Sequence, residues 1–145
     1  MPLEGIYEPS PMPWAADQVA LYESSGGTEG NTIMDLPVVI VTSVGAKSHK
    51  IRKTPLMRVE YEGNYLAVAS MGGAPEHPVW YYNLKNEPHC EIQDGPHKSD
   101  RRARLLEGEE RSLWWQRAVD AFPNYAEYQK NTTREIPLFL LEPWS

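Results

Sequence analysis

The sequence predicts an α+β fold that is mainly β, a split β-barrel of about six mostly antiparallel strands with two or three helices packed against it. Three observations support this class. The 145-residue chain has the length of one domain with a proper hydrophobic core. Its 13 prolines and 10 glycines separate many short apolar runs, a pattern typical of strands and turns. Turn signals between neighbouring runs indicate antiparallel hairpins.

The first 32 residues are expected to form a segment of their own, ahead of a barrel domain at residues 33–145. Residues 1–13 carry four prolines and should form an extended arm. Apolar residues at helical spacing predict a short helix from Trp14 to Ser24, and the polar, glycine-rich residues 24–32 predict a linker. The helix could pack on the core, exchange onto a partner subunit, lie on a membrane surface or cover a site as a lid.

The barrel strands are predicted from apolar runs and from alternation. Residues 36–41 form a continuous apolar run that predicts a buried strand, and residues 56–61 predict the next one. A tight turn at residues 62–64 should connect that strand to a returning strand at residues 65–70. Later strands are expected at residues 88–94, 98–106 and 136–141, the first with Cys90 and Ile92 on one face.

The barrel domain should also contain helices that close its gaps. One is expected to begin near residues 76–78, because proline suits a first turn, and to end before Pro88. Another should begin at residues 108–111, with acidic residues in its first turn. Its apolar stripe is predicted to comprise Leu113, Trp114, Arg117, Ala118 and Ala121. Residues 122–129 predict a break followed by a short helical turn.

Composition excludes several classes of function. A net charge of -6 and a pI of about 5.2 disfavour general binding of nucleic acid. The one cysteine, Cys90, is expected in the core and favours a reducing, cytoplasmic compartment. No apolar run approaches the ~20 residues of a membrane span, and the first residues do not resemble a secretory signal. The four histidines lack metal-ligand spacing, so no metal site is expected.

The most informative stretch is TSVGAKSHKIRKTPL, residues 42–56, between the first two predicted strands. It places four cations within seven residues, where the overall composition predicts about 0.7. Such a cluster repels itself unless it is solvated or faces an anion. Gly45, Ser48 and Thr54 add the N–H and hydroxyl donors that an oxyanion needs. The stretch is therefore either a solvated basic hairpin or a binding site for phosphate or several carboxylates.

The remaining pattern favours a bound cofactor over a protein nucleophile. No GxSxG, P-loop, CxxC or HExxH motif occurs. A Gly-Gly junction at residues 72–73, ahead of a predicted helix, is either an ordinary crossover turn or a second source of free N–H donors. Cations, donors and many aromatic rings suit a flat, anionic, phosphate-bearing cofactor whose own ring supplies the chemistry. These aromatic residues are Trp80, Tyr81, Tyr82, Trp114, Trp115, Tyr125 and Tyr128.

Three segments resemble motifs of the deazaflavin (F420)-dependent nitroreductase family. They are TSVGAKSHKIRKTPL, ASMGGAPEHPVWYYNL and FPNYAEYQKNTTREIPLFLLEP, in the family's order, and the resemblance extends over about residues 36–143. It implies a split barrel related to flavin-binding split barrels. It also implies coenzyme F420, a deazaflavin that bears a phosphate and an oligoglutamate tail, rather than FMN.

The same resemblance implies roles for individual residues. Lys47, Ser48 and Arg52 would hold the phosphate and the tail, with help from Lys53. The other cofactor-binding positions would be Ala46, Thr54, Pro55, Leu56, Met57, Val68, Ala69, Ser70, Met71, Val79, Trp80, Tyr81, Tyr82, Asn83 and Tyr125. Tyr128 and Phe122 would shape the substrate side. Tyr125, Tyr128 and Ser70 are the candidate catalytic residues, as proton donors or orienting groups, with solvent as the alternative donor.

The activity implied is hydride transfer from the reduced cofactor to an electrophilic small molecule, such as a quinone, an enone or unsaturated lactone, or a nitroaromatic. A non-catalytic carrier of the deazaflavin and an FMN-binding split barrel are the alternatives, and a monomer and a homodimer are both compatible with the sequence. Ala46 lacks the cation that the family has first in this loop. Met57, Met71 and Phe122 stand where nitro-reducing members have tyrosine, lysine and tyrosine, which makes the pocket less polar and disfavours nitroreduction.

Overall fold

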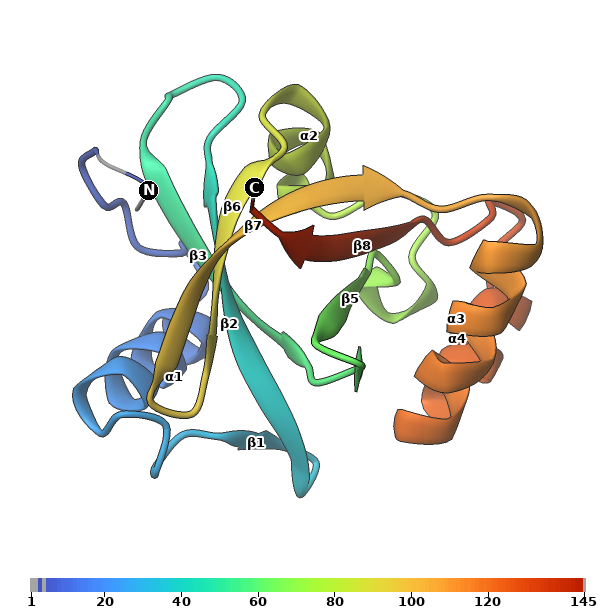
Figure 1. Cartoon of the computed structure of the whole chain (residues 1–145), viewed down its shortest axis with the longest axis horizontal. Coiled ribbons are helices and arrows are strands. Elements are labelled where there is room, and N and C mark those ends of the chain that lie inside the picture. The colour runs from blue at the N-terminus through green and yellow to red at the C-terminus, as the bar shows by residue number, and fades with distance from the viewer. Residues whose placement is uncertain (1–2, 4, 145) are drawn as a thin grey trace.

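A computed structural model describes residues 3 and 5–144 and shows a curled antiparallel sheet with helices on both sides (Figure 1). The mainly β class is confirmed, although the described residues form eight strands and four α-helices; the two-residue strands β1 and β4 were not predicted as separate elements. The elements in order are α1 (Pro13–Ser24), β1 (Thr32–Ile33), β2 (Leu36–Val44), β3 (Ile51–Met57), β4 (Glu60–Tyr61), β5 (Asn64–Val68), the 3₁₀ turn η1 (Met71–Gly73), α2 (Val79–Asn86), β6 (His89–Asp94), β7 (His97–Leu105), α3 (Gly108–Ala121), α4 (Asn124–Lys130) and β8 (Leu138–Pro143).

The sheet has the order β1-β2-β6-β7-β8-β5-β4, and β3 pairs with β2 outside this path. Every pair of named strands is antiparallel. In Figure 1, β6 and β7 form a long curled hairpin, and α3 and α4 lie together at the far end of the sheet from α1. The curl leaves β3 at an edge, close to α1 and α2.

Alternate residues of the central strands are buried in different cores. Val39 and Val41 of β2 lie in a central core under α2, whereas Val38 and Ile40 pack against α1. The residues of β8 and β5 are divided in the same way between the central core and a second core beneath α3 and α4. Successive strand residues point to opposite faces, so a strand buried on both faces must be apolar throughout. This explains why these strands were visible as continuous apolar runs.

A buried tyrosine contributes to the attachment of α1 to the sheet. Tyr22 is 1% exposed, and its hydroxyl accepts a hydrogen bond from the Gly95 N–H at 2.7 Å. The same hydroxyl lies 3.2 Å from the Val38 carbonyl oxygen and 3.3 Å from that of Gln93, so it can donate to either. Trp14, one of the apolar residues at helical spacing in this helix, is 58% exposed. Val19 and Tyr22 of this helix pack on Val38 and Ile40 of β2.

The second strand of the barrel begins earlier than predicted. The prediction of a strand at residues 56–61 is wrong, because β3 covers Ile51–Met57 and only two residues beyond it form β4. The connection between β2 and β3 therefore contains only residues 45–50, and Arg52 and Lys53 are strand residues. Pro55 pairs with Ile40 of β2 on a strand whose opposite side carries no named strand, where a missing N–H is tolerated. The beginning of β3 was not predicted because Arg52, Lys53 and Pro55 interrupt its apolar pattern.

Smaller differences concern the ends of elements. β5 ends at Val68, so Ser70 lies beyond the strand rather than within it. The chain turns there into η1, where Met71 and Gly72 have φ values of 46° and 65°. Leu113, predicted on the buried stripe of α3, is 54% exposed, because the helix turns Trp114 and Ala118 toward the sheet instead.

Removing the Tyr22 hydroxyl should destabilise the fold without leaving a large cavity. Tyr22→Phe deprives the Gly95 N–H of its acceptor, and we expect the free energy of unfolding to fall by about 1–3 kcal/mol. Urea denaturation followed by tryptophan fluorescence measures this change. Tyr61→Phe, at a ring that is 45% exposed, is the control and should change the stability by no more than ~0.5 kcal/mol. Equal effects of the two substitutions would contradict the assigned role.

Candidate active site

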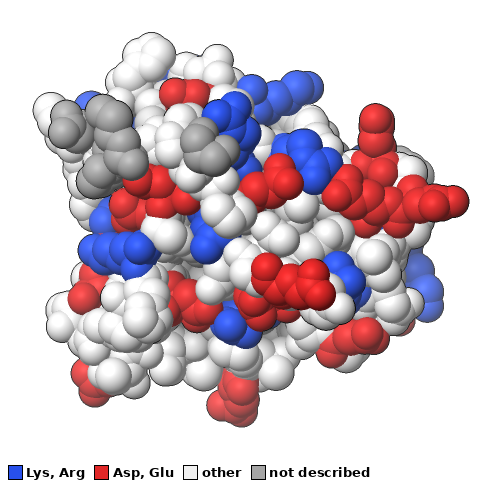
Figure 2. All heavy atoms as spheres, in the orientation of Figure 1, with Lys and Arg blue, Asp and Glu red and all other residues white. Residues whose placement is uncertain are grey.

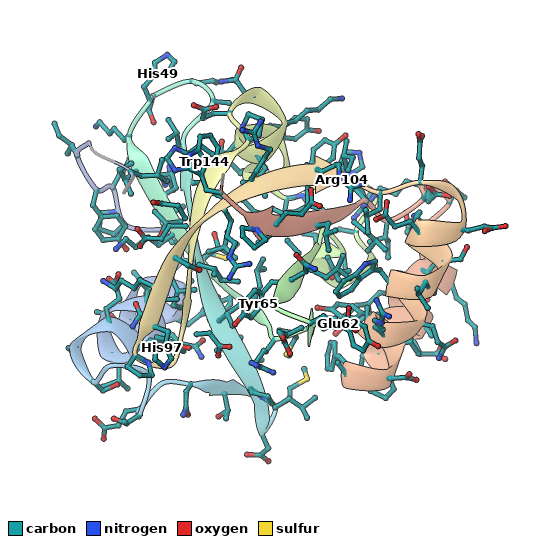
Figure 3. All side chains as sticks on the ribbon, in the orientation of Figure 1. His49, Glu62, Tyr65, His97, Arg104 and Trp144 are labelled. Carbon is teal, nitrogen blue, oxygen red and sulfur yellow. The ribbon has the colours of Figure 1, made fainter. Side chains whose placement is uncertain are left out.

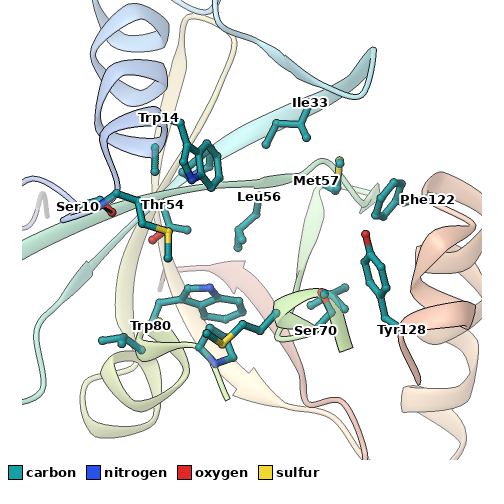
Figure 4. A pocket seen from close by; sticks show the side chains of 18 of the residues that line it. Ser10, Trp14, Ile33, Thr54, Leu56, Met57, Ser70, Trp80, Phe122 and Tyr128 are labelled. Atoms are coloured by element: carbon teal, nitrogen blue, oxygen red, sulfur yellow. Dashed lines mark hydrogen bonds between the residues drawn. The ribbon is translucent and has the colours of Figure 1, made fainter. Parts of the chain in front are cut away.

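An apolar cavity of about 530 Å³ opens between β3, η1, the start of α2 and α4. The N-terminal segment forms one of its sides through Ser10, Met12 and Trp14. Figure 4 shows Trp14 and Ile33 on one side, Trp80 on the opposite side, and Phe122 with Tyr128 at the end. Large flat or flexible apolar side chains thus surround a space wide enough for a ring system.

A second cavity of about 460 Å³ lies beside the first, and we call it the polar cavity because most of the residues that line it are polar or charged. Val79, the first residue of α2, lines both, so the two spaces are neighbours. The other residues that line the second cavity are Glu8, Gly45, Ala46, Lys47, Ser48, Arg52, Tyr82 and Asn83. The basic connection between β2 and β3 therefore faces the start of α2 across a defined space.

The connection between β2 and β3 is held in place by short hydrogen bonds. The Gly45 N–H donates to the Lys50 carbonyl oxygen at 2.8 Å, and the Ala46 N–H donates to Asn83 Oδ1 at 2.9 Å. Asn83 is 3% exposed, so this bond fixes the loop to α2. A Cβ at position 45 would lie 2.6 Å from Ser48 Oγ, which explains the glycine there. These bonds define the shape of the loop and its position against α2.

The cations of this region already have acidic neighbours. Lys53 forms an ion pair with Glu23 of α1. Arg52 Nη1 and Lys50 Nζ lie 3.8 Å and 4.0 Å from the Glu8 carboxylate. Figure 2 shows the same mixture on one face of the whole molecule, where Lys and Arg are interspersed with Asp and Glu. Lys50, Arg52 and Lys53 thus have acidic neighbours, an arrangement compatible with both alternatives, a solvated basic hairpin and a binding site for phosphate or several carboxylates.

Arg134 holds the segment that borders the apolar cavity. Its Nη2 donates to the Ser70 carbonyl oxygen at 2.8 Å, and its Nη1 and Nε donate to those of Ala69 and Ala74 at 3.1 and 2.9 Å. The segment is also pressed against α4, because a Cβ at Gly73 would lie 2.7 Å from the Tyr128 carbonyl oxygen. Sequence reasoning missed this role of Arg134, whose only signal was its place in NTTREIP.

Three aromatic rings close the end of the apolar cavity. Phe122 and Tyr125 meet edge to face with centroids 4.9 Å apart, and Tyr128 lies 6.0 Å from Phe122 and 6.3 Å from Tyr125. Burial raises the pKa of Tyr125 above its usual value, and the neighbouring Tyr128 raises it further. Tyr125 therefore stays protonated at neutral pH. Tyr128 is less buried, and in Figure 4 its hydroxyl points into the cavity, toward Phe122.

The structure brings most of the predicted site residues to these two cavities. The apolar cavity is lined by Lys53, Thr54, Pro55, Leu56, Met57, Val68, Ser70, Met71, Val79, Trp80, Phe122, Tyr125 and Tyr128. The polar cavity receives Ala46, Lys47, Ser48, Arg52, Tyr82 and Asn83. Ala69 and Tyr81 line neither cavity. Both are buried in the central core, where Tyr81 packs against Phe139.

A sequence model of the family described as F420H(2)-dependent quinone reductase matches residues 14–143. The chain belongs to this family. An F420H(2)-dependent quinone reductase of Mycobacterium tuberculosis strain H37Rv is 34% identical over 126 residues, which cover 84% of this chain and 85% of that protein.

Two solved structures are similar over most of the chain. One is described as an F420-H2 dependent reductase, FDR-A, and is 54% identical, covering 77% of this chain and 98% of that one with a TM-score of 0.71. The other is described as a domain-swapped dimer and is 51% identical, covering 92% and 100% with a TM-score of 0.73. The predicted deazaflavin oxidoreductase and its cofactor, coenzyme F420, are confirmed by membership of this family.

Two kinds of feature are absent from the described part of the chain. Among residues 3 and 5–144, no three His, Cys, Asp or Glu side chains are placed to hold a metal ion. Figure 3 illustrates the separation of the histidines, with His49 at the tip of the β2–β3 connection and His97 at the tip of the β6–β7 hairpin. Within the same residues, no helix is long and apolar enough to cross a membrane.

The contact between Arg134 and His77 predicts that the stability of the fold depends on pH. Desolvation lowers the pKa of His77 below its usual 6.5, and the nearby charges of Arg134 and Lys85 lower it further. The neutral ring accepts a hydrogen bond from Arg134 Nη1 at 3.1 Å on Nδ1, which protonation would abolish. The folded state binds this proton less well than the unfolded state. The contribution of His77 to stability is therefore complete above pH 6.5 and is lost as the pH falls below it.

Urea midpoints measured between about pH 7.5 and 5 test this dependence. The wild-type protein should lose more stability over this range than His77→Gln. His97→Gln, which removes an exposed histidine, should follow the wild-type curve. Parallel curves for the wild type and His77→Gln would show that the proton on His77 is not linked to folding.

Proposed function

We propose that the protein binds reduced coenzyme F420 across its two cavities and uses it to reduce quinones. The deazaflavin rings occupy the apolar cavity, and the phosphate and oligoglutamate tail occupy the polar one. The observation that carries this proposal is the adjacency of the two cavities, which share Val79. A flat ring system joined to an anionic chain needs such a pair of neighbouring spaces, one apolar and one rich in cations and N–H donors.

The residues present fit both parts of this cofactor. Leu56 and Trp80 offer apolar surface to a planar ring system, from the edge strand and from α2. Lys47 and Arg52 supply positive charge to the polar cavity, and Ser48 adds a hydroxyl. Carboxylates and phosphates bind best to such charge-assisted donors. The absence of a cation at position 46 leaves this cavity with one tail contact fewer than the resembled family has.

When bound, the reduced cofactor supplies a hydride. The task of the protein is to hold the acceptor atom of the quinone close to the donor and to keep water out. β3 and α2 form the side walls, and the segment fixed by Arg134 forms the edge that carries Ser70. The quinone gains the hydride and must also gain a proton to become a hydroquinone. We assign that proton to the Tyr128 hydroxyl, which solvent re-protonates afterwards.

The lining of the apolar cavity favours quinones among the possible acceptors. Met57, Met71 and Phe122 all border it, and none can donate a hydrogen bond to a nitro group. Enones and unsaturated lactones remain acceptors of the same electronic type, so they belong in the substrate panel. The likeness to a structure described as a domain-swapped dimer supports a homodimer as the assembly of this chain.

Cofactor titration followed by turnover tests the proposal. The oxidised form of coenzyme F420 should bind to the purified protein, whereas FMN should bind far more weakly because it lacks the polyanionic tail. With the reduced form, a simple naphthoquinone should be consumed and the cofactor absorbance should return. Nitroaromatics should react more slowly than the quinone. Binding without turnover of any quinone, enone or lactone would instead favour a non-catalytic carrier.

Replacing the proposed proton donor should slow turnover and leave cofactor binding intact. Tyr128→Phe removes only the hydroxyl, and we expect kcat to fall on the order of 10²-fold, the usual contribution of general acid catalysis. Tyr125→Phe is the matched control, because Tyr125 is buried and its raised pKa makes it the poorer acid. Both are measured at saturating reduced cofactor. Unchanged kcat in both variants would assign the proton to solvent.

A further inference from the structure

A segment ahead of α1 pairs with the beginning of β3. The Glu8 N–H donates to the Ile51 carbonyl oxygen at 2.9 Å, and the Ile51 N–H donates to the Ile6 carbonyl oxygen at 2.8 Å. Tyr7 and Ile51 form a parallel bridge. The position of Glu8 is therefore set by main-chain hydrogen bonds, and it does not depend on the charge of its side chain.

This pairing places an acidic side chain inside a cavity otherwise suited to anions. Glu8 lines the polar cavity together with Lys47 and Arg52. Its carboxylate is 3.8 Å from Arg52 Nη1 and 4.0 Å from Lys50 Nζ. Both separations are too long for hydrogen bonds, and the Glu8 side chain is 43% exposed. Exposed ion pairs of this kind contribute little to stability. An incoming anion can therefore replace Glu8 as the partner of a cation with little loss of free energy.

The neighbouring ion pair is of a different kind. Lys53 and Glu23 are in close hydrogen-bonded contact, with side chains 18% and 25% exposed. Lys53 borders the apolar cavity rather than the polar one. Lys53 is thus paired closely with Glu23 of α1, whereas Arg52 and Lys50 lie at longer distances from their partner Glu8. Of the two cations next to Glu8, Arg52 lines the polar cavity, so a ligand bound there can contact it.

We propose that Glu8 is a specificity-determining residue that competes with the anionic tail of the cofactor for Arg52, which lines the polar cavity beside it. This inference rests on the proposed function. A tail carboxylate or phosphate that enters the polar cavity meets the Glu8 carboxylate as a like charge and has to share or replace it. Glu8 therefore lowers the affinity for tail-bearing cofactor and reduces the gain from each added glutamate. It leaves the affinity for the tail-free ring system unchanged.

Removing this charge should strengthen binding, and only through the tail. Glu8→Gln keeps the size of the side chain and the main-chain bonds of the segment. We expect the Kd for tail-bearing oxidised cofactor to fall roughly three- to tenfold, since one charge faces two cations at short range. The gain should grow with the number of tail glutamates and should shrink between about 0.02 M and about 0.5 M salt. Fluorescence titration with cofactor of defined tail lengths measures it.

Three comparisons separate the possible outcomes. Glu109→Gln changes the net charge equally but lies on α3, at the far end of the sheet in Figure 1, and should have no effect. The deazaflavin riboside without phosphate or tail should bind equally to the wild type and to Glu8→Gln. Arg52→Ala should move the tail dependence in the opposite direction.

An unchanged Kd in Glu8→Gln would overturn the role of Glu8 while leaving the proposed function in place. An equal gain for the tail-free riboside would do the same. A gain in Glu109→Gln as large as that in Glu8→Gln would likewise reduce the effect to net charge. If the wild type binds neither tail-bearing nor tail-free cofactor, the proposed function fails, and the role of Glu8 fails with it.

Discussion

The arrangement of the molecule depends on strands that bury both faces. In β2, β5 and β8, alternate residues enter the central core and a second core, under α1 for β2 and under α3 and α4 for β5 and β8. This burial fixes the helices at opposite ends of the curled sheet. The space left between them is bordered by β3, η1 and the start of α2, and the apolar cavity occupies that space. The position of the site thus follows from the way in which each strand divides its side chains between two cores.

Electrostatics then distinguishes the two neighbouring spaces. A chain with a net charge of -6 concentrates cations where β3 begins, and acidic side chains from the N-terminal segment and α1 face them. The bond between Ala46 and Asn83 holds the loop that precedes β3 against α2. Membership of the F420H(2)-dependent quinone reductase family gives this arrangement its chemical meaning, because coenzyme F420 joins a flat ring system to a chain of negative charges.

Sequence reasoning succeeded where a signal was local and periodic. The continuous runs of β2 and β8 and the proline before α2 gave their elements to within a few residues. It failed at β3, because cations and Pro55 interrupt the apolar pattern of that strand. The roles of Arg134 and Glu8 depend on contacts 57 to 65 and 42 to 44 residues away along the chain, which no local pattern encodes. Ala69 and Tyr81 were placed at the site by adjacency in a motif, although alternation and helical pitch turn them into the core.

Pro55 has a consequence for the behaviour of the molecule in concentrated solution. The outer side of β3 is the kind of unpaired strand edge on which other chains can add and begin aggregation. Its first residue, Ile51, is already covered by the chain's own Tyr7 segment, and Pro55 offers no N–H farther along. An invading strand would find only a short, interrupted row of bonding groups between these two points. The same edge that opens onto the cavity is therefore protected against the growth of fibrils.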